Sequence, residues 1–162
     1  MEDRAAGAVA DELRALLRRV PAPVSVVTVD TGSERLGLTV ASVVSLSLEP
    51  PLVGVAISRQ AALHELLREA RAFAVNLLAG GQEWLAQHFA RGVPPIAMWS
   101  GVAVEDSPLA PLLVGALGWL ECRVVSELAA GDHTFFVGEV VSVRSGALAP
   151  PLVYQGSEYR TL

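Results

Sequence analysis

The stretch GLTVASVVSLSLEPP, residues 37–51, carries the clearest structural pattern in this chain. It alternates with a period of two, which places successive side chains of an extended strand on opposite faces. One face is almost entirely apolar and is expected to lie in a core. Its members are Leu36, Leu38, Val40, Ser42, Val44, Leu46 and Leu48. The other face is small and hydroxyl-rich, with Gly37, Thr39, Ala41, Val43, Ser45 and Ser47. The Pro50-Pro51 pair that follows predicts a turn.

Two interpretations of this alternation are open from the residues alone. An ordinary strand pair with serine and threonine facing water would show it, because alternation is common in antiparallel sheets. A binding surface would show it too, since small side chains let a ligand approach the backbone and hydroxyls both donate and accept hydrogen bonds. The pattern by itself favours the first interpretation.

Composition excludes several classes of protein. The chain has 162 residues, of which 52% are hydrophobic and 18% charged, and this predicts one domain with a substantial core and room for a buried subunit interface. A net charge of −5 argues against nucleic acid as the main partner, because phosphate binding requires a basic face. All 12 basic residues are arginine, so no lysine can form a Schiff base or serve a phosphate-binding loop.

The cellular environment is also indicated. Cys122 is the single cysteine, so no intrachain disulfide can form, as is usual in a reducing compartment. No apolar run approaches the roughly 20 residues of a membrane span, and no apolar signal core follows the charged residues 2–4. We therefore expect a cytoplasmic protein that does not enter a membrane.

The remaining pattern predicts many strands and few helices within a single domain, residues 1–162. The expected helices are 2–19 (an N-terminal helix within residues 1–20), 61–70 and 82–91. The expected strands are 24–29, 36–48, 52–57, 73–78, 118–126, 134–143 and 152–154, and residues 92–101 are expected to be a loop. Short hairpins and the absence of a G-x-G-x-x-G turn favour a mainly β antiparallel barrel with flanking helices over a doubly wound sheet.

Several segments together resemble the flavin reductase family with the FMN-binding split-barrel fold. The central motif is G-x-T-x-x-S-x-x-S-x-S followed by P-P. The other segments are LVGVAISR, FAVNLL, QEWLAQHFA, LECRV, GDHTFFVGEV and PPLVY, and they cover roughly residues 20–160. The resemblance implies an antiparallel split barrel that forms a homodimer, binds FMN or FAD, uses NAD(P)H as co-substrate and supplies reduced flavin to a partner monooxygenase.

The resemblance also implies which residues bind flavin. By position in the motif, they are Thr39, Ala41, Ser42 and Ser45. Ser58 and Arg59 match the segment that reaches the flavin phosphate, and Tyr154 could line the isoalloxazine ring or the dimer contact. For Arg59 the alternative is a solvated charge at the end of a strand.

One departure from the family concerns the phosphate end. Family members often continue past Arg59 with hydroxyl residues, whereas this chain continues with Gln60-Ala61-Ala62. Either the phosphate is held more weakly, or Gln60 compensates for the missing donors.

His133 is the candidate catalytic residue. In the family a histidine at this place lies near the flavin ring and the nicotinamide, where it orients NAD(P)H or stabilises charge on reduced flavin. The alternative is a turn histidine bonded to a backbone carbonyl. We interpret His64 and His88 as surface or packing residues, and Trp99 as an anchor for its loop. The histidines are not at metal-ligand spacing with Cys122, so no metal is proposed.

Three functional hypotheses remain open. The first is an NAD(P)H:flavin oxidoreductase serving a monooxygenase. The second is a split-barrel protein that holds flavin as a prosthetic electron carrier or oxidase-like group, and the third is a dimeric barrel that has lost flavin and catalysis. The chain shows no catalytic dyad, but flavin and nicotinamide carry the electronic part of hydride transfer, so the missing dyad does not argue against an enzyme.

Overall fold

The structure, a computed structural model, describes residues 2–90 and 94–162, with the backbone alone for residues 2–4. The helices are α1 (Glu2–Leu17), α2 (Ala62–Ala70), α3 (Glu83–Ala90) and α4 (Pro95–Met98). The strands are β1 (Ala22–Pro23), β2 (Ser25–Asp30), β3 (Arg35–Val40), β4 (Val44–Leu48), β5 (Pro51–Ser58), β6 (Ala72–Leu77), β7 (Val104–Glu105), β8 (Leu112–Leu113), β9 (Gly118–Ala130), β10 (His133–Ser145), β11 (Leu152–Gln155) and β12 (Glu158–Thr161).

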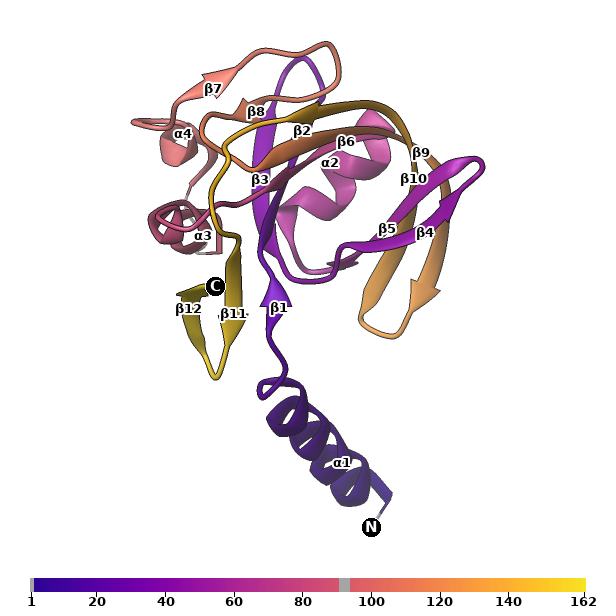
Figure 1. Cartoon of the computed structure of the whole chain (residues 1–162). Helices are drawn as coiled ribbons and strands as arrows, with labels where there is room; N and C mark the ends of the chain where they lie inside the picture. The colour runs from indigo at the N-terminus through magenta and orange to yellow at the C-terminus, as the bar shows by residue number, and fades with distance from the viewer. Residues whose placement is uncertain (1, 91–93) are drawn as a thin grey trace.

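A seven-stranded antiparallel sheet forms the body of the protein, in the order β3-β2-β6-β9-β10-β5-β4. The sheet curves around α2, which contacts strands from both of its halves (Figure 1). It stays open between its edge strands β3 and β4, and β1, β11 and β12 form a small separate sheet. The mainly β, antiparallel prediction is therefore confirmed.

The core lies where β2 and β6 pair. Nearly every side chain of these strands is buried, because α2 covers one face and the segment around β8 covers the other. Asn76 is buried here with its hydrogen bonds satisfied: its amide donates to Val26 O at 2.9 Å and accepts from Leu113 N at 2.7 Å. These bonds attach the β8 segment to the sheet.

The predicted burial of one face of residues 37–51 is only half right. Leu36 and Val40 in β3 are buried, at 4% and 9% exposure. The side chains of the same face in β4 are not: Val44, Leu46 and Leu48 are 44%, 46% and 84% exposed. The expected strand 36–48 is interrupted between Val40, where β3 ends, and Val44, where β4 begins. β4 is an edge strand that pairs only with β5. Among the residues that the structure describes, none covers the outer face of β4, so this part of the prediction is wrong.

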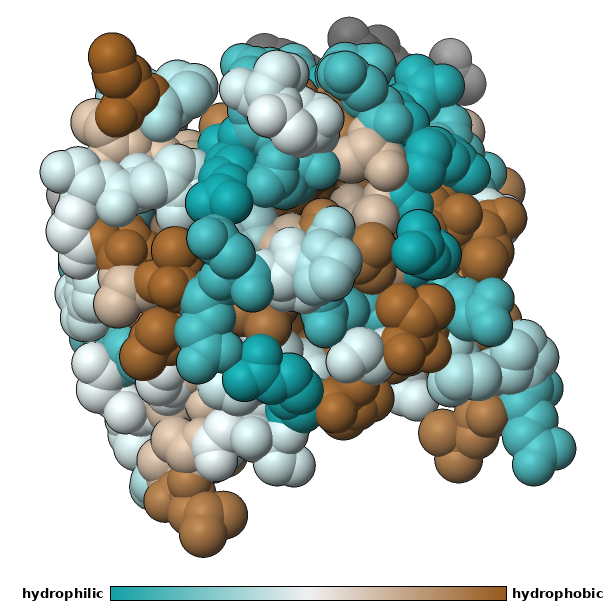
Figure 2. All heavy atoms as spheres, turned by 90° about the horizontal axis from the view of Figure 1, so that it is seen from above, coloured by the Kyte–Doolittle hydropathy of each residue, from teal (hydrophilic) through white to brown (hydrophobic). Residues whose placement is uncertain are grey.

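The N-terminal helix forms as expected but stands away from the body of the protein (Figure 1). Its apolar side chains Val9, Leu13, Leu16 and Leu17 are all more than half exposed. Further apolar side chains reach the surface on β4, β9 and β10, and in the view of Figure 2 hydrophobic side chains form separate brown groups between hydrophilic ones. Contiguous apolar surface of this kind marks sites where proteins, membranes or ligands bind, whereas single scattered side chains are ordinary.

Two smaller predictions need comment. The expected loop 92–101 contains the short helix α4, which begins at Pro95. Residues 92–93 of this loop lie outside the described residues, and so does Arg91, the last residue of the expected helix 82–91. In the described ranges, no helix combines the length and hydropathy that crossing a bilayer requires.

Candidate functional site

Five of the predicted site residues line one cavity of about 460 Å³: Thr39, Ala41, Ser42, Ser58 and His133. They come from β3, the bend after it, the end of β5 and the start of β10. The rest of the lining consists of Leu38, Val40, Ala56 and Ala61. The small alanine side chains leave backbone from several segments within reach of a ligand, which suits a flat ring system.

A second cavity of about 270 Å³ lies beside the first, and Leu38 and Ala61 belong to both linings. It passes Gln60 and reaches the first turn of α2 and the ring of Phe89. Ala61 is the N-cap of α2 and has no side chain that could bond the N–H groups of the first turn, of which His64 N donates to Ala61 O. These N–H groups, with the positive end of the helix dipole, suit a phosphate. The backbone can therefore supply donors that Gln60-Ala61-Ala62 lacks in its side chains.

The hydroxyls predicted to bind flavin already have partners within the protein. Thr39 Oγ donates to Ala86 O at 2.7 Å. Ser42 Oγ donates to Ala56 O at 3.1 Å and accepts from Ala56 N at 3.2 Å. Both side chains thus use their single hydroxyl hydrogen to hold the walls of the cavity together, and for a ligand they retain only acceptor capacity.

His133 is placed in the cavity by strand pairing. It begins β10 opposite Ser58, the last residue of β5. Its Nδ1 lies 2.7 Å from Asp132 Oδ1, and its side chain is 43% exposed. The hydrogen bond from His133 holds the pKa of Asp132 below its ordinary value, and the charge of Arg59 contributes less. Because an ionised carboxylate only accepts, Nδ1 carries the hydrogen and Nε2 is the atom left for a ligand.

The other predicted residues lie outside this cavity. Ser45 is exposed on β4 opposite Val53. Arg59 lines a separate cavity of about 350 Å³ together with His64 and Arg68, among others. Gln60 lines the second cavity, beside the first turn of α2.

Tyr154 lies on a third side of the site. It borders a small cavity that also contains Thr39 and Ala41, and its ring packs against Tyr159 with centroids 5.0 Å apart. The structure therefore brings Tyr154 near the motif but on the face turned toward α1.

Sequence reasoning missed two features of the site and was right about a third residue, His64. Ala56 and Ala61 carry no chemical signal and become lining residues only through the pairing of β5 and the start of α2. The first turn of α2 has no side-chain cap, and the sequence contained the signal for this: the residue before the helix is Ala61, which cannot cap. His64 is a packing residue, as one of its two interpretations had it: it is buried, and its Nε2 lies 2.7 Å from Thr134 Oγ1.

Comparison with known proteins identifies the family of the chain. The model of the flavin reductase like domain matches residues 17–162. The reductase component of 4-hydroxyphenylacetate 3-monooxygenase from Thermus thermophilus is 42% identical, over 90% of this chain and 92% of that protein. The NADH:FMN oxidoreductase of Rhodococcus erythropolis is 39% identical, over 95% of this chain and 83% of that protein.

Solved structures give the same result for the fold. The NADH:FAD oxidoreductase of Streptomyces globisporus, in complex with NAD and FAD fragments, superposes with a TM-score of 0.88 at 35% identity and covers 94% of this chain and 92% of that one. On the family match and on these relatives, the chain belongs to the flavin reductase like domain family.

Proposed function

We propose that this protein is an NAD(P)H-dependent flavin reductase that supplies reduced FMN or FAD to a partner monooxygenase. The observation that carries the proposal is the pair of neighbouring cavities, one at His133 and Ala41 and the other at the first turn of α2, with Leu38 and Ala61 in both linings. One end suits a flat ring and the other suits a phosphate, which are the two ends of a flavin nucleotide. The named relatives, among them reductase components and NADH:flavin oxidoreductases, support the same activity.

When bound, the flavin accepts hydride from the nicotinamide, so the residues of the protein need only bind and orient the two molecules. At the ring end, Thr39 and Ser42 keep the walls of the cavity in place through their bonds to Ala86 and Ala56. His133 is oriented by Asp132, which leaves Nε2 available to hold the nicotinamide or to stabilise charge on the flavin.

At the phosphate end, the first turn of α2 provides backbone N–H groups, with Ser58 and Gln60 beside it. Arg59 lies just beyond, and its charge contributes to the field at this end. Arg59 lines the neighbouring cavity, so contact with the phosphate requires a different rotamer of this long side chain. Ser45 is exposed on β4, outside both cavities, and the proposal gives it no contact with the flavin.

A homodimer is part of the same proposal. The apolar stripe of α1 and the exposed side chains of the edge strand β4 together present Val9, Leu13, Leu16, Leu17, Val44, Leu46 and Leu48. A second copy of the chain is the partner that buries such surfaces symmetrically. Light scattering at micromolar concentration tests this: we expect twice the mass of one chain, and a monomer would contradict it. A cytoplasmic location, favoured by the single buried thiol, belongs to the proposal as well.

The activity is tested by NADH or NADPH consumption with and without added free flavin. We expect consumption that requires free FMN or FAD and saturates with its concentration. A yellow protein whose consumption ignores added flavin would indicate a prosthetic group instead. A colourless protein with no consumption under any condition would leave only the non-catalytic barrel.

A further inference from the structure

Met98 lies at the proposed flavin site, and the proposed function gives it no role. It is the last residue of the short helix α4 and lines the second cavity, with Gln60 and Ala61 among the other lining residues. The chain's other methionine, Met1, lies outside the described residues. Met98 is 6% exposed, so an oxidant reaches its side chain from this cavity. The reaction open to it is oxidation, because peroxides transfer an oxygen atom to a thioether.

The sulfur atom of Met98 has a defined contact with the flavin-binding motif. Gly37 N donates to Met98 Sδ at 3.3 Å, and a thioether is a weak acceptor of such a bond. Gly37 begins the G-x-T motif on β3 and lines the same cavity as Met98. An oxygen atom added to the sulfur therefore changes a contact that the motif makes with the wall of the cavity.

The surroundings of this contact leave little room for an added atom. A Cβ at Gly37 would lie 2.7 Å from the ring of Phe89, which is fully buried. The backbone of α4 is held against α3, since His88 Nε2 donates to Met98 O at 2.6 Å. A sulfoxide oxygen is therefore accommodated only if β3 shifts or if the Met98 side chain turns further into the cavity.

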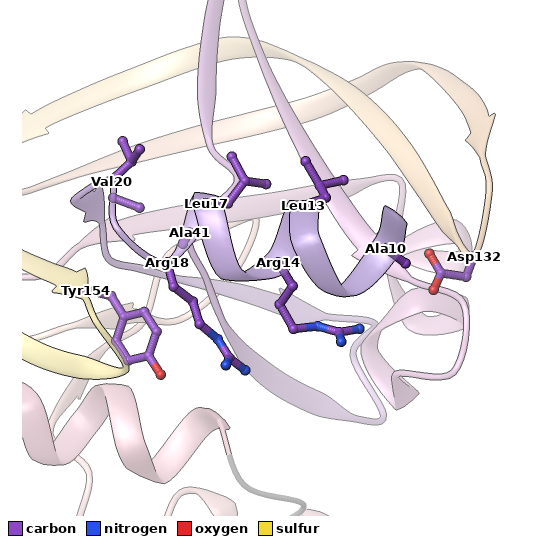
Figure 3. Close-up of a pocket in the computed structure, with 10 residues that line it drawn as sticks. Ala10, Leu13, Arg14, Leu17, Arg18, Val20, Ala41, Asp132 and Tyr154 are labelled. Carbon is purple, nitrogen blue, oxygen red and sulfur yellow. The ribbon is translucent and has the colours of Figure 1, made fainter. Parts of the chain in front are cut away.

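The other sulfur in the described part of the chain is protected from the same oxidant. Cys122 is fully buried on β9, and burial raises the pKa of its thiol to about 12. Peroxide attacks the thiolate, so this thiol does not compete with Met98. The larger cavity between α1 and the body, walled by Leu13 and Leu17 among others (Figure 3), has no methionine or cysteine among its described lining residues.

We propose that Met98 is a site of oxidation to methionine sulfoxide, and that this modification lowers the affinity of the protein for flavin. The inference rests on the proposed function for its oxidant: reduced flavin passes two electrons and two protons to oxygen, which gives hydrogen peroxide. In the reaction with Met98 the O–O bond of the peroxide breaks, one oxygen atom forms a bond to sulfur, and the other leaves as water. The sulfur is oxidised by two electrons and the peroxide is reduced.

Two consequences for the cavity follow from the chemistry of the sulfoxide. The group is bulkier than the thioether, and its oxygen carries partial negative charge. It therefore takes up space in a cavity of about 270 Å³ and adds a negative end to the place assigned to the flavin phosphate. Both effects weaken flavin binding. The modification thus slows flavin reduction when reduced flavin forms faster than a monooxygenase consumes it.

The test exposes the wild type, Met98→Leu and Cys122→Ala to hydrogen peroxide and then removes the peroxide with catalase. Leucine nearly conserves the volume of methionine and cannot take up the oxygen. For each protein we measure the mass of the peptide that contains position 98 and the FMN dissociation constant, against its own unexposed sample. The wild type and Cys122→Ala should gain one oxygen atom on Met98 and bind FMN about tenfold more weakly, equivalent to the loss of one hydrogen bond to the phosphate. Met98→Leu should keep its affinity.

Reversal by methionine sulfoxide reductase needs no variant. It should remove the added oxygen from the oxidised wild type and restore FMN binding. The inference is overturned if Met98 stays unoxidised, if its oxidation leaves the FMN dissociation constant unchanged, or if Met98→Leu loses affinity as the wild type does. During turnover with NADH, FMN and oxygen, the same sulfoxide should form, and catalase should prevent it. If the wild type consumes no NADH with free flavin, the proposed function fails, whereas the experiment with added peroxide still decides on Met98.

Discussion

Ser42 offers the sharpest test of how the cavity is built. Its hydroxyl bonds both backbone groups of Ala56 in β5, as the backbone of a neighbouring strand would. The β4–β5 ladder ends at the pair Val44 and Gly54. Two residues further along β5, the N–H and C=O of Ala56 are bonded by Ser42 Oγ, at 3.2 and 3.1 Å. Ser42→Ala removes both bonds. At about 1 kcal/mol for each neutral hydrogen bond, the free energy of unfolding should fall by about 2 kcal/mol.

The assay is chemical denaturation at a fixed protein concentration, since dimerisation would make stability depend on concentration. For a chain of this length the loss corresponds to a melting temperature lower by about 4–8 °C. Ser45→Ala is the matched control: Ser45 is exposed on β4 and makes no side-chain hydrogen bond among the described residues, so its effect should stay within about 0.5 kcal/mol. Flavin affinity should fall with Ser42→Ala and not with Ser45→Ala. Equal stability of the two variants would refute the reasoning.

Three other predictions concern single positions. A Cβ at Gly37 would lie 2.7 Å from the ring of the fully buried Phe89, so Gly37→Ala should cost about 1–3 kcal/mol of unfolding free energy in denaturant titrations. Burial raises the pKa of the Cys122 thiol to about 12. The unfolded chain gives up this proton near pH 9 and the folded chain does not, so stability should fall by about 1.4 kcal/mol per pH unit above about pH 9, and Cys122→Ala should lack that slope. Finally, His133→Ala should slow flavin reduction or raise the KM for NAD(P)H in stopped-flow measurements while flavin affinity stays nearly intact; wild-type rates and NADH dependence would make it only a turn residue.

The amino-acid sequence by itself was sufficient for the local structure and for the outline of the site. The hairpin of β2 and β3, the paired strands β9 and β10, and the helices α1 to α3 were predicted within a few residues. These features depend on side-chain periodicity and on turn residues such as Gly131, which act over a few positions of the chain. The motif and the strand after it likewise contained four of the predicted residues that line one cavity, and the turn before β10 contained the fifth, His133.

The tertiary structure alone decided what each of those residues does. Ser58 and His133 meet because β5 pairs with β10, and no local pattern specifies that long-range register. The hydroxyls of Thr39 and Ser42 donate hydrogen bonds to Ala86 O and Ala56 O. These two carbonyls come within reach only when the chain folds.

The same holds for which apolar side chains are covered. Alternation placed Val44 and Leu48 on the same face as Val40, but the bend before β4 and its place at the sheet edge leave them exposed. The arginines of α1 read as favourable charges near a helix end, and only the attachment of Arg18 to Gly156 places them beside the proposed flavin site. Periodicity determines which side chains share a face, whereas burial and proximity depend on what packs against that face, and this is set by contacts between segments distant in the chain.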